Sequence, residues 1–198
     1  MHVETFSREA LLARLRETRL VGFGGAEVYA HATLDLRRLE PAELTPAQRY
    51  VLMPGVRRIL ELRETLLEHD VDVFALDGGV HLHTQDEAIP VLPPIVERST
   101  EPDGRVVWLI NDGIHRVYAA RASESPINVV TVEGASHPYY ALAASWEDVV
   151  ELEELPDSFQ KKEYRVPGNY KALFRDFNAV FPGVQAERKQ SNPAHLAR

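Results

Sequence analysis

One short segment combines residue types that together bind anions, Asp112-Gly113-Ile114-His115-Arg116. It follows an apolar run and precedes a segment with helical spacing, so we expect it to form the turn from a strand into a helix. The first backbone N–H groups of a helix have no intrahelical acceptor, and the helix dipole places partial positive charge there. Gly113 lets a phosphate approach the backbone, while Arg116 and His115 supply further hydrogen-bond donors. The segment therefore predicts an anion site.

Asp112 has two further roles in this prediction. Its carboxylate is placed to orient His115 or to help hold a Mg²⁺ ion that bridges phosphates. The alternative interpretation is structural: Asp112 caps the helix, and His115 and Arg116 lie on its exposed face. The residues alone leave both interpretations open.

Predicted strands and helices alternate around this segment, which favours a mixed α/β sheet. The segments nearest to it are a strand over 105–111 with an apolar middle, a helix over 114–122 and a strand over 127–132. Earlier in the chain we expect a helix over 8–19, an alternating strand over 28–36, a helix start at 45–48, a helix from Pro54 to about His69, a hairpin of 71–76 with 80–83, and an edge strand within 89–96.

The C-terminal third has helical spacing and helix-capping residues, and predicts helices over 145–152 and 169–181. The whole chain then divides into an N-terminal helix (1–19), a nucleotide-binding domain (20–135), a helical C-terminal extension (136–184) and a polar tail (185–198).

Composition limits the class of protein. The 198 residues are 44% hydrophobic and include no cysteine, which excludes disulfides, thiolate metal sites and thiol nucleophiles. No apolar run approaches the roughly 18 residues of a membrane span, and no secretory signal is visible at the start. We therefore expect a cytoplasmic protein without a membrane partner.

The nine residues Asp112 to Ala120 resemble the signature of the ParB/sulfiredoxin superfamily, in which Asp-Gly-x-x-Arg or Gly-x-His-Arg precedes an Ala-rich helix. The resemblance covers roughly residues 26–134. It implies a ParB/sulfiredoxin-like fold whose motif binds the phosphates of ATP, CTP or ADP. Members include sulfiredoxins, ParB-type CTP switches and archaeal-type free serine kinases.

Departures from these relatives narrow the implied function. Sulfiredoxins have a cysteine where this chain has Ile114, so sulfinic acid reduction is excluded. ParB partition proteins continue into a helix-turn-helix, for which the sequence after Gly134 gives no clear signal. The net charge of −8 also lacks the basic footprint of a DNA-binding protein, so DNA is not an expected partner.

The resemblance then implies a small-molecule kinase whose partners are a nucleotide, ATP or ADP, and a small hydroxylated metabolite, with Mg²⁺ as cofactor. Asp112, Gly113, His115 and Arg116 would bind the phosphates, Asp112 would hold the metal, and His115 would also be catalytic. A nucleotide-gated binding switch that hydrolyses slowly or not at all is the alternative.

The general base of such a kinase is a separate prediction. In the free serine kinases it is a glutamate early in the fold, and Glu27, Asp35 and Glu40 are the candidates here. We choose Asp35, which lies on the polar face of its predicted strand. A catalytic carboxylate near the acceptor hydroxyl is what this chemistry requires.

Two other segments offer binding groups. Lys161 and Arg165 lie in a basic, aromatic segment that can close over nucleotide phosphates, or can be a surface turn. His81 and His83 share a face of a predicted strand, and with Glu87 they resemble the first metal motif of cupins, although no second motif is present. A metal-dependent enzyme is therefore a further alternative. The competing interpretation is that the two histidines only face solvent and bind no metal.

Overall fold

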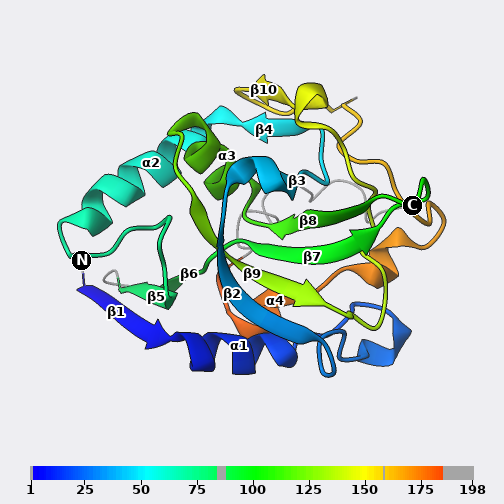
Figure 1. Ribbon diagram of the computed structural model, residues 1–198, viewed down its shortest axis with the longest axis horizontal. Helices are drawn as coiled ribbons and strands as arrows, with labels where there is room; N and C mark the ends of the chain where they lie inside the picture. Colours follow the sequence, from blue (N-terminus) through cyan, green and yellow to red (C-terminus); the bar gives the residue numbers. More distant parts are fainter. Residues whose placement is uncertain (1, 84–87, 158, 185–198) are drawn as a thin grey trace.

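The computed structural model describes residues 2–83, 88–157 and 159–184. Its centre is a five-stranded mixed sheet with the order β2-β9-β7-β8-β3 (Figure 1). These strands are β2 (Thr33–Leu39), β3 (Leu44–Thr45), β7 (Ile95–Thr100), β8 (Val106–Asp112) and β9 (Ile127–Glu133). β2 is antiparallel to β9 and β7 to β8, whereas β7 is parallel to β9 and β3 to β8. The predicted mixed α/β fold is confirmed.

Two small sheets flank the central one. The first is antiparallel, with the order β1-β5-β6, and the second is the parallel pair β10 and β4. Their strands are β1 (His2–Ser7), β4 (Tyr50–Leu52), β5 (Gly78–His83), β6 (Ala88–Val91) and β10 (Val150–Leu152).

Helices cover both faces of the central sheet, with α2 and α3 on one face and α1 and α4 on the other (Figure 1). They are α1 (Arg8–Arg16), α2 (Met53–Leu67), α3 (Ile114–Ala122) and α4 (Phe177–Val180). Successive residues of a strand face opposite sides of a sheet, so Val96 packs in the core beneath α2 and α3 while Ile95 packs in the core beneath α1 and α4. Short 3₁₀ helices occur at Phe23–Gly25, Pro41–Glu43, Trp146–Asp148 and Tyr170–Leu173.

The elements around the predicted anion site match their predictions, but upstream two predictions are wrong and one strand begins later than predicted. Residues 45–48 do not begin a helix, because Leu44 and Thr45 pair with β8 and the next helix, α2, begins at Met53. The strand predicted over 28–36 begins at Thr33. The hairpin of 71–76 with 80–83 is absent: an Asx turn, in which the Asp72 carboxylate accepts from Phe74 N, holds the first segment, and β5 pairs with β1 and β6.

The C-terminal extension is less helical than predicted. Residues 145–152 form a 3₁₀ turn and β10, not a helix. The helix predicted over 169–181 is divided into a 3₁₀ turn and α4, and between them Arg175 is buried in an ion pair with Glu97 of β7. At Arg175 the chain forms an isolated antiparallel β-bridge with Leu20 in place of a helical turn.

Candidate functional site

The turn from β8 into α3 depends on Gly113. This residue is the N-cap of α3, with φ 88° and ψ 26°, a left-handed conformation that favours glycine. A Cβ at this position would lie 2.9 Å from Pro94 Cβ and 3.0 Å from Arg116 Nη2. No side chain caps α3, so Asp112 does not have the capping role of the alternative interpretation.

Arg116 and Asp112 form an ion pair across this turn. Arg116 Nη2 donates to Asp112 Oδ2 at 2.6 Å, and each side chain is only 11% exposed. The pair holds the guanidinium beside the N-terminus of α3. Arg116 is therefore not on an exposed helix face, and Asp112 pairs with Arg116 and not with the predicted partner His115.

His115 lies between the starts of α3 and α2. Its Nε2 accepts a hydrogen bond from the backbone N–H of Leu52 at 3.3 Å, so in the neutral ring Nδ1 carries the proton. The ring packs against Gly55, where an added Cβ would lie 2.9 Å from both Nε2 and Cδ2. Gly55 therefore allows α2 and His115 to approach this closely.

This contact predicts that Gly55→Ala destabilises the protein, the opposite of the usual effect of alanine in a helix. Alanine normally stabilises a helix over glycine, by up to about 1 kcal/mol. Here we expect the free energy of unfolding to fall by about 1–3 kcal/mol, because the methyl group overpacks against the imidazole. Urea denaturation measures the change, and Gly168→Ala is the control, since a Cβ there meets no atom within 4 Å. A more stable Gly55→Ala protein would contradict this packing.

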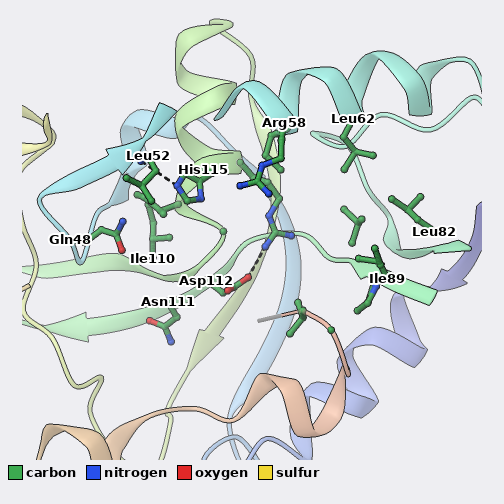
Figure 2. Close-up of a pocket in the computed structure, with 18 of the residues that line it drawn as sticks. Gln48, Leu52, Arg58, Leu62, Leu82, Ile89, Ile110, Asn111, Asp112 and His115 are labelled. Atoms are coloured by element: carbon green, nitrogen blue, oxygen red, sulfur yellow. Dashed lines mark hydrogen bonds and ion pairs between the residues drawn. The ribbon is translucent and has the colours of Figure 1, made fainter. Parts of the chain in front are cut away.

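A cavity of about 890 Å³ opens at this turn and is lined by residues of α2, α3, β4, β5, β6, β8 and segment 182–184. Two arginines line it, Arg58 of α2 and Arg116 of α3, and we call their part of the cavity the cationic centre. Arg58 lies beside His115 there (Figure 2). Pockets of this size with a few convergent polar groups are typical ligand sites.

Two arms of different chemistry extend from the cationic centre (Figure 2). Leu62, Leu82 and Ile89 lie on one side and form the apolar arm. Gln48 and Asn111 lie on the other side, and with Lys162 they form the polar arm.

Hydrogen bonds position the side chains of the polar arm. Gln48 Nε2 donates to the backbone oxygen of Tyr50 at 2.8 Å, and Lys162 Nζ donates to the hydroxyl of Tyr140 at 2.5 Å. Asn111 is 4% exposed, its Nδ2 donates to Glu97, and its Oδ1 has no protein partner in the described structure. A carboxylate only accepts hydrogen bonds, so the amide nitrogen of Asn111, and not its oxygen, faces Glu97.

The predicted site residues are distributed as follows. Asp112, Gly113, His115 and Arg116 all line the cavity. Asp35 is exposed on β2, where it accepts from Leu36 N at 2.8 Å, and it is not among the lining residues.

The basic segment that contains Lys161 and Arg165 lies elsewhere than predicted relative to the cavity. Lys161 is exposed and does not line the cavity, whereas its neighbour Lys162 does. Arg165 also lies outside the lining set and forms an ion pair with Glu101 at 2.9 Å. Lys162 belongs to the same basic segment that the sequence offered for phosphate binding, whereas Arg58 and Gln48 were missed because no local motif marks them.

His81 and His83 lie on β5, with ring centres 6.2 Å apart. Glu87, the third member of the predicted metal site, lies outside the described residues. Within the described ranges, no three histidine or acidic side chains are arranged to hold a metal ion. Those ranges also contain no helix with the length and apolar character that a membrane crossing needs.

The family model of the ParB CE domain matches residues 10–150, from α1 to β10. The chain belongs to this family. The predicted ParB-like resemblance is thereby confirmed, and the match places α3 and every strand of the central sheet inside the ParB CE domain.

Other comparisons add little to the ParB CE assignment. No curated protein matches the chain. A solved structure, the protein Atu1540 from Agrobacterium tumefaciens, is 19% identical with a TM-score of 0.29. The similarity covers 53% of this chain and 43% of that one, so the chain spans less than half of Atu1540.

Proposed function

We propose that this ParB CE domain binds a nucleoside di- or triphosphate, with the phosphates at the N-terminus of α3. The observation that carries the proposal is that Arg58, His115 and Arg116 all line the one cavity that opens at that helix end. Guanidinium groups bind phosphate oxygens with paired, charge-assisted hydrogen bonds, and the helix end adds backbone donors.

The apolar arm supports a nucleoside as the rest of the ligand. Leu62, Leu82 and Ile89 offer apolar surface for a base beside the phosphate centre. A base buried there gains hydrophobic contact, while the charged phosphates stay with the cations.

Phosphoryl transfer to a small hydroxylated metabolite is the reaction that we propose for the bound nucleotide. Mg²⁺ is commonly held by one or two carboxylates together with substrate phosphates, and Asp112 is the one carboxylate among the described lining residues. Asp112 therefore fits the role of metal ligand, and the ion would neutralise phosphate charge. The polar arm is the place for the acceptor.

The position of a general base bears on the choice between a kinase and a switch. A general base must reach the acceptor hydroxyl directly or through one water, and Asp35 is outside the cavity lining. This observation supports a second candidate function, a nucleotide-gated switch that hydrolyses its nucleotide slowly. ADP release from ATP should need an acceptor, with L-serine tested first, if the protein is a kinase. A switch should release ADP slowly and equally without one.

Nucleotide binding is tested by thermal stabilisation with ATP, ADP, CTP and GTP, each with and without Mg²⁺. Ligand at 100 times its Kd stabilises the folded state by about 2.7 kcal/mol, which is roughly 5–10 °C for a domain of this size. Arg58→Ala should lose most of this rise.

Arg57→Ala is the matched control, because Arg57 is the adjacent residue but pairs with the exposed Glu153 at 2.7 Å. It should keep the full stabilisation. If no nucleotide stabilises the wild-type protein, or if both arginine variants respond alike, the proposed site is wrong.

A further inference from the structure

A second group of binding side chains lies on the small sheet, away from the nucleotide cavity. In the β1–β5 ladder, His2 is opposite His83 and Glu4 is opposite His81. Opposite residues of an antiparallel pair share one face, with Cβ atoms about 4.5–5.5 Å apart. Leu82 lines the cavity, so its neighbours His81 and His83 face the other side of the strand.

The spacing of the two opposite histidines suits a shared ion. The ring centres of His2 and His83 are 5.5 Å apart. Two imidazole nitrogens held at about 2.0–2.1 Å from one ion, at a tetrahedral angle, place the ring centres roughly 5 Å apart. The separation of the two ring centres is therefore close to that of two imidazoles bound to one metal.

Glu4 gives His83 the environment of a metal ligand. Glu4 Oε2 lies 3.0 Å from His83 Nε2, which leaves Nδ1 of the ring for an ion. Ligating histidines usually have such a carboxylate on their second nitrogen, which fixes the ring and raises its basicity. The side chains of His83 and Glu4 are 37% and 61% exposed, so an ion reaches them from solvent.

His81 has a different neighbour. Its ring packs against Phe6, with the ring centres 4.9 Å apart. No three potential metal ligands converge within the described residues, so this site has two histidines.

We infer that His2 and His83 chelate a divalent ion of borderline softness, Zn²⁺ or Cu²⁺, across the β1–β5 ladder, with Glu4 as the residue that orients His83. Imidazole is the ligand type these ions prefer, and water completes the coordination. The pair differs from the predicted set of His81, His83 and Glu87, because it joins two strands. The site is independent of the proposed nucleotide function.

The test is calorimetric titration of the untagged full chain with Zn²⁺. We expect one ion per chain, with affinity reduced at least tenfold in His2→Asn and in His83→Asn. His31→Asn, a change at an exposed histidine outside the ladder, should bind as the wild type does. Glu4→Gln should weaken binding by roughly tenfold, the usual cost of losing such a carboxylate.

Electron paramagnetic resonance with Cu²⁺ identifies the ligands. The wild type should show coupling to two imidazole nitrogens, and His83→Asn to one. Metal-free thermal melts of all variants should match the wild type, because the changed groups are on the surface. Unchanged binding in His83→Asn would overturn the inference, because His83 would then not be a ligand. Absence of Zn²⁺ binding at millimolar concentration would also overturn it.

Discussion

Replacing Arg175 with methionine is expected to lower the free energy of unfolding by about 3–5 kcal/mol, the usual cost of breaking a buried ion pair by removing one partner. Arg175 and Glu97 have side chains only 1% and 4% exposed, and Arg175 donates to both carboxylate oxygens, at 2.8 and 2.9 Å. It also donates to three backbone carbonyl oxygens. The variant leaves a carboxylate charge buried without its counterion.

The pair belongs to a wider buried network. Tyr29 donates its hydroxyl to Glu97, and burial together with that carboxylate raises the pKa of Tyr29 well above its usual value. Burial opposes the charge on Arg175 and lowers the pKa of the guanidinium, but the interactions with Glu97 and Tyr29 together outweigh it and raise that pKa. The network ends at Asn111, the residue before Asp112, and so connects the C-terminal extension to the candidate site.

Urea denaturation measures the effect of Arg175→Met. Adding Glu97→Gln should recover part of the loss, because the unpaired charge is then removed. Arg57→Met, which breaks an exposed pair with Glu153, should leave stability close to that of the wild type. An Arg175→Met protein as stable as Arg57→Met would show that the buried pair does not hold the extension.

Arg116→Gln is expected to weaken nucleotide binding by roughly 100-fold. Hydrogen bonds to charged groups contribute about 1.5–3 kcal/mol each, and a factor of ten corresponds to about 1.4 kcal/mol, so losing a bidentate phosphate contact gives this magnitude. Calorimetric titration with ATP and Mg²⁺ measures the change.

The control for that variant is Asp112→Asn. It also removes the ion pair of Asp112 with Arg116, but it keeps the guanidinium. Without Mg²⁺ it should bind ATP at least as tightly as the wild type, because a negative charge beside the phosphates is gone. Equal losses in both variants would mean that the ion pair has only a structural role.

The parts of the site that lie close together in sequence could be predicted from it. Asp112, Gly113, His115 and Arg116 follow each other at a strand-to-helix turn, and the local signals of an apolar strand, a glycine and a helix pattern are sufficient to place them. The ParB-like resemblance rests on the same residues.

The rest of the cavity depends on contacts between distant segments. Arg58 reaches the site because α2 packs on α3, and Lys162 reaches it through its contacts with Tyr139 and Tyr140. Thr45 has a good capping sequence, but parallel pairing with Leu109 places it in a strand. At Thr45, strand pairing therefore overrides the local preference for a helix. Pairing and packing between distant segments cannot be recognised in a short stretch of sequence.

The most direct test of the phosphate site is the backbone amide spectrum of the ¹⁵N-labelled protein during titration with ATP and Mg²⁺. Binding at the N-terminus of α3 predicts the largest chemical-shift changes at Gly113, Ile114 and His115, with smaller changes at Leu62 and Leu82 in the apolar arm. Saturating ATP that leaves these amides unmoved, or that moves only residues outside the cavity, would contradict the account.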